Sequence, residues 1–382
     1  MPLHKESETL TLDLALWLLP GSNQRRVAQL VQQAASPTLS SRLLLEQMTH
    51  HPAFKEGTRQ LARLALNDPW KLPYSDRLLA HLRWAEQDHH WLLALHELPP
   101  LLQNIVDPPL LLCAKGQITS LDAPALAVVG SRSLTPEGRH NALNWSHRLT
   151  RQGLNIISGL ARGVDGFAHQ GALNARQEGA SGTTHAVLAH GLDRVYPLEH
   201  RELATAISES GALLSEYPLG TAPLARHFPA RNRIVTGLSL GVLVIEAAKR
   251  SGSLVSARHA MEQGREVMAI PGSVRRVQSE GCNELIRQGA ALVTDADDVL
   301  VELAQPLKQC LQSNSSVNAA KPPPALSDHL RPLYCLISDV PQSSDQLLSS
   351  LGLTAAEGSA QLLELELDGY IEQQPGGWCL SS

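Results

Sequence analysis

Residues 125–132 read ALAVVGSR and lead into Thr135-Pro136, and this stretch decides the fold of the chain. The apolar run at 125–130 has the length and composition of a buried strand. Thr135 is a good N-cap residue, and Pro136 suits the first position of a helix. The stretch therefore predicts a strand, a glycine turn and a helix in succession.

Six further apolar runs follow, with room for helices between them. Strands that alternate with helices form a parallel sheet covered on both faces. We therefore expect an α/β fold, with a Rossmann-like doubly wound and mostly parallel sheet. The predicted strands are ALAVVG (125–130), LNIISG (154–159), HAVLAHG (185–191), ALLSEY (212–217), GVLVIEA (241–247), EVMAIPG (266–272) and AALVT (290–294).

The segments on either side of this core have a different character. Apolar residues before it recur at three- and four-residue spacing, which is typical of helices. Gly21, followed by Arg25 and Arg26, faintly suggests a helix-hairpin-helix, but the usual second glycine is missing, and a plain helical bundle is the better interpretation. The predicted parts are a helical N-terminal domain at 1–115, a Rossmann-like core at 116–304, a linker at 305–325 and a winged-helix-like C-terminal domain at 326–382.

The C-terminal part has an unusual charge distribution. QSNSSVNAAKPPPA marks the linker, and the last residues read as helices followed by a β-wing at 369–380. From Pro332 to Ser382 there is no Lys or Arg, but there are seven acids. A transcription regulator that reads duplex DNA through this tail would need cations there. We expect a protein-docking module or a structural cap instead.

The overall composition limits the possible functions. The 382 residues are 43% hydrophobic and 18% charged, which excludes a mostly disordered chain. The net charge of −5 excludes a general basic coat for nucleic acid, so any anion site must be local. Aromatics make up 4%, so stacking on many aromatic platforms is not expected. Arg outnumbers Lys 25 to 7, which suits phosphate binding, and the base composition of the genome is the plainer alternative explanation.

The sequence gives no signal for metal binding, secretion or membrane insertion. The five cysteines show no CxxC pair and no local pairing with His at metal spacing, so we expect reduced thiols and no metal site. The first residues lack a basic region and a cleavage site, and no apolar run could span a bilayer. A cytoplasmic location and no cofactor are expected.

Two strand-end loops carry residues suited to phosphate. Gly130, Ser131 and Arg132 follow the first core strand, and Ser158, Gly159, Arg162 and Gly163 follow the second. Ligands of doubly wound sheets bind at such carboxyl ends, beside helix N-termini that attract anions. Each loop alone could be a tight turn with a surface Arg, but two from adjacent strands converge. The glycine spacing differs from GxGxxG, so a dinucleotide fingerprint is not predicted.

Two later segments complete the candidate site. Arg231, Asn232 and Arg233 could clamp a phosphate and reach a base edge, although a helix start with solvated arginines is the plainer alternative. Ser251 and Gly252 follow another strand. The predicted DNA-binding set is Gly130, Ser131, Arg132, Ser158, Gly159, Arg162, Gly163, Arg231, Asn232, Arg233, Ser251 and Gly252.

Across residues 125–292 the motifs GSR, SGLARGVDxxAHxGAL, AVLxxGLDRVYP, LLSEYPxG, FPARNRIVTGLS, EAxxxSGSLxSA, GREVMAIPG and LIRQGA occur in order. This series resembles the DNA-processing protein A family, DprA or Smf. The resemblance implies a homodimer that binds single-stranded DNA in a basic pocket, protects incoming DNA in natural transformation and helps load RecA recombinase. Its pocket arginines match Arg132 and the arginines of FPARNR. The chain departs from many members at Thr183, where several carry a basic residue, and at His200, where many have Asn.

An enzyme is the main alternative, because the core also resembles a wider Rossmann-like superfamily that includes nucleotide- or nucleotide-sugar-processing hydrolases. The candidate catalysts are Asp165, His169, His190 and Glu246. No two of them form a recognised nucleophile–base or metal motif. Asp165 and His169 lie four residues apart and are expected to cap or pack, so we predict that no residue is catalytic.

Overall fold

The computed structural model describes residues 4–20, 27 and 41–310, together with 327, 330–334, 337, 344, 347, 355–368, 370–374 and 377–380. The chain divides into two compact units, Met1–Cys310 and Leu311–Ser382. No helix among the described residues is long and apolar enough to cross a membrane.

A single large sheet organises the first unit. Its described strands run in the order β1-β2-β6-β5-β4-β3-β7-β8-β9. Neighbouring strands pair in parallel from β6 to β9, while β1 with β2 and β2 with β6 are antiparallel. The predicted α/β, mostly parallel sheet is confirmed, and each of the seven predicted runs contains a strand. The bounds are β1 (His90–Ala94), β2 (Leu111–Gly116), β3 (Ala125–Val129), β4 (Asn155–Ser158), β5 (Thr184–Val187), β6 (Ala212–Ser215), β7 (Gly241–Val244), β8 (Glu266–Ala269) and β9 (Ala291–Leu292).

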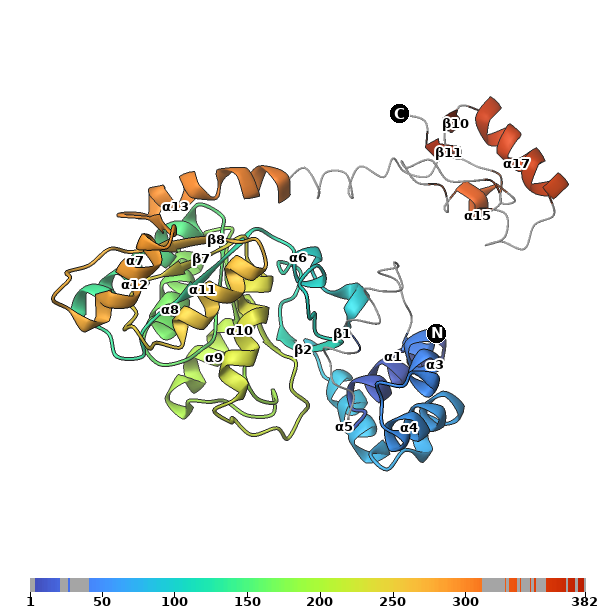
Figure 1. Cartoon of the computed structure of the whole chain (residues 1–382), viewed down its shortest axis with the longest axis horizontal. Coiled ribbons are helices and arrows are strands. Elements are labelled where there is room, and N and C mark those ends of the chain that lie inside the picture. The colour runs from blue at the N-terminus through green and yellow to red at the C-terminus, as the bar shows by residue number, and fades with distance from the viewer. Residues whose placement is uncertain are drawn as a thin grey trace. The chain divides into compact units, whose positions relative to one another are not determined.

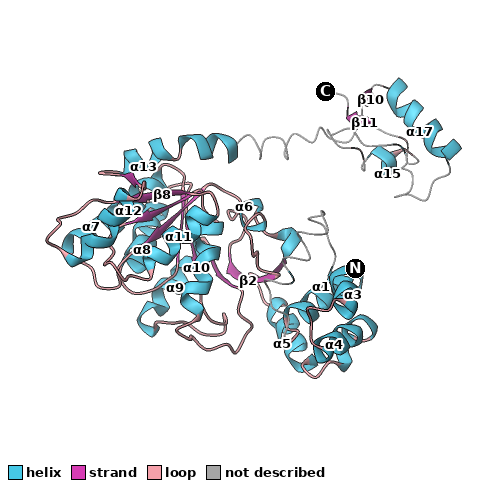
Figure 2. Ribbon diagram, in the orientation of Figure 1, coloured by secondary structure: helices cyan, strands magenta, loops and turns pink. Residues whose placement is uncertain are grey.

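Helices enclose this sheet, as Figures 1 and 2 show. Thr135 caps the first core helix by accepting from the Gly138 amide, and Pro136 opens that helix, as predicted. The bounds are α1 (His4–Trp17), α3 (Ser41–His50), α4 (Glu56–Asn67), α5 (Ser75–Ala85), α6 (Pro100–Gln103), α7 (Pro136–Arg151), α8 (Val164–Gln177), α9 (Arg201–Ser210), α10 (His227–Gly237), α11 (Ser253–Glu262), α12 (Glu280–Arg287) and α13 (Ala296–Glu302), with short 3-10 turns η1 (Pro69–Lys71), η2 (Leu95–Glu97), η3 (Leu198–His200) and η4 (Val277–Ser279).

Side-chain alternation along the strands separates the two faces of the core. In β3, Leu126 and Val128 pack with residues of α7, α8 and α13. Ala125, Ala127 and Val129 pack with residues of α10, α11 and α12 on the other face. Because successive side chains of a strand point to opposite faces, both halves of each strand must be apolar. This explains why the core strands read as continuous apolar runs.

Two boundaries predicted from the sequence differ from the structure. β1, and β2 except for Gly116, lie within the segment predicted as helical, 1–115, yet both strands extend the core sheet beyond β6. All but one residue of β2 is buried, so its apolar run has no period of two, and such a run cannot be told from a buried helix by periodicity. The linker predicted at 305–325 begins too early, because residues 304–310 are helical and 311–326 lie outside the described residues.

The N-terminal helices pack against the sheet through an apolar cluster that includes Leu14, Leu45 and Leu78 together with Leu188 and Leu213 of the core. Polar contacts reinforce it. The Trp17 indole N–H donates to the Glu216 carbonyl at 3.2 Å. His81 Nε2 accepts from the Leu219 amide at 3.0 Å. The proposed glycine turn at Gly21, with Arg25 and Arg26, lies outside the described residues.

The second unit has its own small core. Its described elements are α15 (Arg331–Tyr334), α17 (Ala355–Leu367) and the antiparallel pair β10 (Ile371–Gln374) and β11 (Gly377–Leu380). Leu333, Leu365, Ile371 and Trp378 belong to one buried cluster. The β10–β11 hairpin occupies the position predicted for a β-wing.

Candidate nucleic-acid interface

The main groove of the first unit lies where the order of the strands reverses. From β3 the chain proceeds through β4, β5 and β6 toward one edge, whereas β7, β8 and β9 lie on the other side of β3. Ligands of open α/β sheets bind at this switch point, outside the carboxyl ends of the strands. A groove of about 720 Å³ occurs here, and we call it the switch-point groove. Its lining comes from residues 129–133, 159–165, 196, 223–235 and 248–256.

The loop after β3 places three predicted residues in this groove: Gly130, Ser131 and Arg132. Arg132 is exposed, and its guanidinium lies 5.4 Å from the centroid of the Phe228 ring. Glu246 fixes the loop by accepting from both the amide and the hydroxyl of Thr135. This carboxylate therefore holds the start of α7.

The loop after β4 contributes less than the sequence predicted. Gly159 lines the groove, but Ser158 is buried and donates its hydroxyl proton to the Val128 carbonyl at 2.6 Å. Arg162 does not line the groove and forms a two-point ion pair with Glu199, with N–O distances of 2.6 and 2.8 Å. Gly163 also lies outside the lining. It has φ +82°, and a Cβ there would overlap the Ser131 carbonyl oxygen, so this glycine lets the two loops touch.

Arg231 lines the groove but is almost fully buried, with an exposed fraction of 3%. Its guanidinium donates to the carbonyls of Gly159, at 2.9 Å, and Val187. Asp165 approaches the same segment and accepts from the amides of Gly159 and Ala161 at 3.1 and 3.3 Å. Burial lowers the pKa of Arg231 to about 10, partly opposed by Asp165, so the guanidinium stays charged at neutral pH. Burial also raises the pKa of Asp165, opposed by Arg231 and the two amides.

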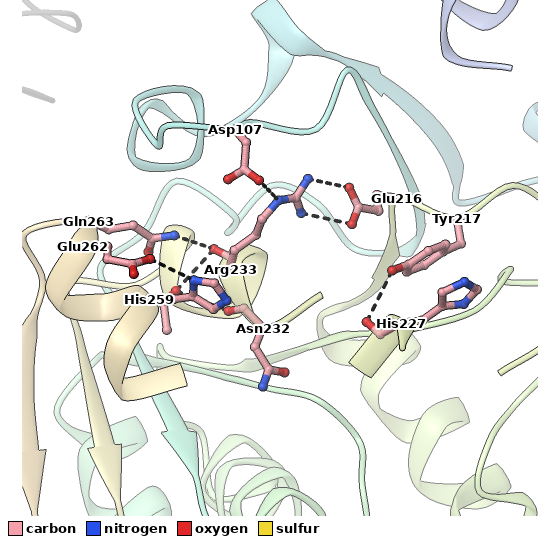
Figure 3. A network of polar contacts seen from close by, with 10 residues as sticks. Asp107, Glu216, Tyr217, His227, Asn232, Arg233, His259, Glu262 and Gln263 are labelled. Atoms are coloured by element: carbon pink, nitrogen blue, oxygen red, sulfur yellow. Dashed lines mark hydrogen bonds and ion pairs between the residues drawn. The ribbon is translucent and has the colours of Figure 1, made fainter. Parts of the chain in front are cut away.

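Asn232 and Arg233 take opposite directions, as Figure 3 shows. Asn232 lines the groove. Arg233 does not, and its prediction as a DNA-binding residue is not supported by its position. Its guanidinium is buried between Asp107, at 3.1 Å, and Glu216, at 2.7 Å. Adjacent residues of a helix point about 100° apart, so one of two neighbours can face the groove while the other enters the core.

The loop after β7 supplies Ser251 and Gly252, as predicted, and three groove residues that the sequence argument missed. Ser253 and Ser256 lie on the first turn of α11, where free amides favour anions. Arg250 precedes them, lines the groove and is exposed. Its signal was its place directly before SGS at a strand end, the same pattern that singled out Arg132.

Two aromatic side chains, Tyr196 and Phe228, also line the groove, although the low aromatic content of the chain argued against many stacking platforms. Tyr196 is 48% exposed, and its ring centroid lies 6.0 Å from that of Phe228 at an interplanar angle of 61°. The low aromatic content of the whole chain concealed this local pair. Its position beside Arg132 provides a surface for a flat, apolar group next to a cation.

The four candidate catalytic residues have structural contacts. Asp165 holds backbone amides and Glu246 holds α7, as described above. His169 is buried, and its Nδ1 hydrogen bonds with the Thr184 hydroxyl at 2.7 Å. His190 Nδ1 hydrogen bonds with the Gly191 carbonyl at 3.0 Å, and the Ser215 hydroxyl donates to the His190 carbonyl at 2.7 Å. Within the described residues, no group of three or more His, Cys, Asp or Glu is placed to hold a metal ion.

Comparison with known proteins agrees with the sequence motifs. Residues 90–304 match the family model of DNA recombination-mediator protein A, and residues 317–377 match the DprA winged helix domain, which confirms the winged-helix prediction. The chain is 41% identical to Protein Smf of Escherichia coli over 307 residues, covering 78% of this chain and 79% of that protein. It is 47% identical to DNA processing protein DprA of Streptococcus pneumoniae over 201 residues, covering 53% of this chain and 69% of that protein.

Two solved structures share the fold at substantial sequence identity. DNA processing protein A of Streptococcus pneumoniae aligns with a TM-score of 0.62 and 35% identity, covering 76% of this chain and 96% of that one. DNA processing protein A of Helicobacter pylori, studied for its single-stranded DNA binding mode, aligns with a TM-score of 0.51 and 30% identity, covering 57% of this chain and 98% of that one.

Proposed function

The chain belongs to the DNA recombination-mediator protein A family, the DprA/Smf DNA-processing proteins, and we propose that it binds single-stranded DNA in the switch-point groove. One observation carries the proposal: two exposed arginines, Arg132 and Arg250, share the groove with the Tyr196–Phe228 pair. Neither arginine makes an ion pair with a described residue, so both can meet phosphates. The proposed contacts are Gly130, Ser131, Arg132, Gly159, Asn232, Arg250, Ser251 and Gly252.

Preference for single strands over duplex follows from the aromatic pair. A base can stack on an aromatic side chain only when it is free of its own stack and partner strand. In duplex DNA the bases are enclosed, and the phosphates alone would reach Arg132 and Arg250. The groove therefore offers a single strand two kinds of contact and a duplex only one.

We further propose, from family membership, that the protein acts as a homodimer, protects incoming DNA in natural transformation and helps load RecA recombinase. Two exposed apolar side chains support the homodimer: Leu292 at 50% on the edge strand β9, and Val301 at 72% on α13, the next helix in the chain. RecA loading predicts faster RecA filament assembly on single-stranded DNA when the protein is present. An unchanged assembly rate would contradict that role.

The binding proposal is tested by comparing a single-stranded oligonucleotide with the matching duplex over a salt series. We expect tighter binding of the single strand. Arg132→Ala should weaken it and reduce the slope of log K against log salt by about 0.7, the value for one single-strand phosphate contact. Arg148→Ala is the control, because Arg148 lies in the last turn of α7, at the far end from Pro136. Equal binding by wild type and Arg132→Ala would contradict the proposed contact.

We also propose that the groove binds DNA without cleaving it. Hydrolysis requires an acid and a base, or a metal, placed at the scissile bond. Asp165 lines the groove and Glu246 lies two residues after β7, and both are engaged with backbone groups or Thr135. Labelled oligonucleotides and nucleoside monophosphates should survive incubation with the protein and Mg²⁺ or Mn²⁺. Turnover that disappears in Asp165→Asn or Glu246→Gln would favour the hydrolase alternative.

A further inference from the structure

The loop between β8 and α12 presents apolar and basic side chains to solvent. We call residues 270–279 the β8 loop. Within it, Val274 is 87% exposed and Val277 is 59% exposed. Arg275 and Arg276 stand between them and are also exposed. Single exposed valines are ordinary on protein surfaces, but two that flank a pair of arginines form a patch with both apolar area and positive charge.

Backbone contacts hold this loop against the switch-point groove. The Gln278 carbonyl accepts from the Ala247 amide at 2.8 Å, and Ala247 is three residues before Arg250. The Arg276 guanidinium pairs with Glu137, in the first turn of α7, at 2.7 Å. The loop therefore extends from the β7 end of the groove to the helix that follows Arg132. Arg276 and Gln278 line a hollow of about 430 Å³ together with Thr135, Pro136 and Glu137 at the start of α7.

The order of the strands gives the direction of this surface. β3, β7 and β8 are consecutive in the sheet, and their carboxyl ends lie along one edge. Neighbouring strands are about 4.8 Å apart, so the β8 loop begins about 10 Å from the end of β3. Along one DNA strand, phosphates are about 3.4 Å apart in a duplex, and they are farther apart when a single strand is extended. Two or three nucleotides cover this distance.

We propose that the path of single-stranded DNA continues from the switch-point groove onto the β8 loop, where Arg275 contacts a phosphate and Val274 packs against a base. This inference rests on the proposed function of the groove. DNA is favoured over an acidic protein segment because the loop contacts Ala247, three residues before Arg250, and Glu137, five residues after Arg132. Residues 272–279 contain no acid that would repel a phosphate. Glu137 faces the loop and is already paired with Arg276, and Glu280 follows the loop in the first turn of α12.

The test measures affinity as a function of oligonucleotide length. The short oligonucleotide is the thymidine dinucleotide, whose single phosphate cannot contact both Arg132 and Arg275. The long one is an oligothymidine of about 12 nucleotides, within the range that single-strand grooves bind. The Val274→Ser/Arg275→Ala variant should bind the short oligonucleotide like wild type. It should bind the long one at least about fivefold more weakly in 0.1 M salt, because one lost phosphate contact removes about 0.7 from the salt slope.

Two control variants separate this inference from the proposed function. Arg148, like Arg276, is an exposed arginine in an ion pair. The Arg148→Ala variant should bind both lengths like wild type. Arg132→Ala should weaken both lengths, because it lies in the groove itself. If wild type bound neither oligonucleotide, the groove function would fail. If wild type bound both oligonucleotides, two results would overturn the extended path. The Val274→Ser/Arg275→Ala variant would lose the same affinity for both lengths, or it would lose affinity for neither.

Discussion

Arg231 and Asp165 hold the same residue, Gly159, from opposite sides. The guanidinium of Arg231 donates to the Gly159 carbonyl at 2.9 Å, and the carboxylate of Asp165 accepts from the Gly159 amide at 3.1 Å. A Cβ at position 159 would overlap the Arg231 guanidinium, so only glycine fits between them. The two buried charges therefore fix the floor of the groove, and Arg231 has a positioning role that the sequence did not distinguish from DNA contact.

Replacing Arg231 should primarily destabilise the fold. Arg231→Gln leaves Asp165 buried without its opposing charge and removes donors to two carbonyls, which should cost about 3–5 kcal/mol. Urea unfolding measures this loss, and Arg132→Ala should unfold like wild type. Adding Asp165→Asn to Arg231→Gln should recover part of the loss, since it removes the unpaired charge. Normal stability with lost DNA affinity in Arg231→Gln would instead place Arg231 in direct contact with DNA.

Tyr196 should contribute to affinity through its ring. Tyr196→Ala should lower the affinity for a single-stranded oligonucleotide by about 1–3 kcal/mol, the range for loss of one stacked base. Tyr196→Phe should retain most of the affinity, because the ring remains. Fluorescence anisotropy with a labelled oligothymidine measures both variants. If Tyr196→Phe lost as much affinity as Tyr196→Ala, the Tyr196 hydroxyl would be the contact with DNA, and stacking on the ring would be excluded.

Arg233 should matter for stability and little for DNA. Arg233→Leu leaves Glu216 and Asp107 facing each other without a cation, at a cost of about 3–5 kcal/mol in the free energy of unfolding. The fraction that remains folded should bind single-stranded DNA with wild-type affinity, because Arg233 does not line the groove. Thermal unfolding and a binding titration below the transition provide the two readings. Reduced affinity with wild-type stability would restore the sequence-based assignment.

Buried histidines should make the fold sensitive to mild acid. Burial lowers the pKa of His169 to about 3 and that of His185 to about 4, against 6.5 for the free side chain. The unfolded chain therefore binds protons below pH 6.5 that the folded chain does not. Stability from these groups is complete above pH 6.5 and is lost as the pH falls toward 4. Each histidine lowers the free energy of unfolding by up to about 1.4 kcal/mol for every unit by which the pH falls in this range.

His185 offers the clearest test of this pH dependence, because its Nδ1 accepts a hydrogen bond from the Ala212 amide at 3.0 Å. Protonation of Nδ1 would place its new N–H against the amide N–H and break this hydrogen bond. Urea unfolding of wild type and His185→Gln between pH 6.5 and 5 compares the two slopes. The variant should show a shallower decline, by as much as one proton's contribution. Parallel declines would show that His185 does not carry this effect.

The core of the fold was predictable because its strands and helix starts are each marked by a short, contiguous stretch of sequence. Each parallel strand is a short apolar run, and each is followed by a helix start such as Thr135-Pro136. β2 escaped prediction because a strand buried on both faces has no period, and its pairing with β6 depends on a segment far along the chain. β1 joins the sheet only through β2. The order of strands around β3 is likewise a property of the whole sheet.

The candidate site was predictable to the level of loops. Gly130, Ser131 and Arg132 follow a strand that ends at the switch point, and position alone marks them. The direction of a side chain depends on the tertiary partners that compete for it. Arg162 forms an ion pair with Glu199, and Arg233 forms one with Glu216. Neither glutamate is close to its arginine in the sequence. Tyr196 and Phe228 come together from segments 32 positions apart, which no single motif reveals.

The antiparallel pairing of β2 with β6 also sets an order in time. Gly116 pairs with Ala212, so β2 leaves the ribosome roughly a hundred residues before its partner. At about 5–20 residues per second, its apolar edge waits about 5–20 seconds. An unpaired apolar edge invites aggregation. The N-terminal helices are synthesised before β2, and α1 contacts it in the finished fold. Their described residues line none of the groove. β1 can pair with one edge of β2 as soon as both are made, and we expect the N-terminal helices to cover the apolar side chains of β2 while its other edge waits for β6.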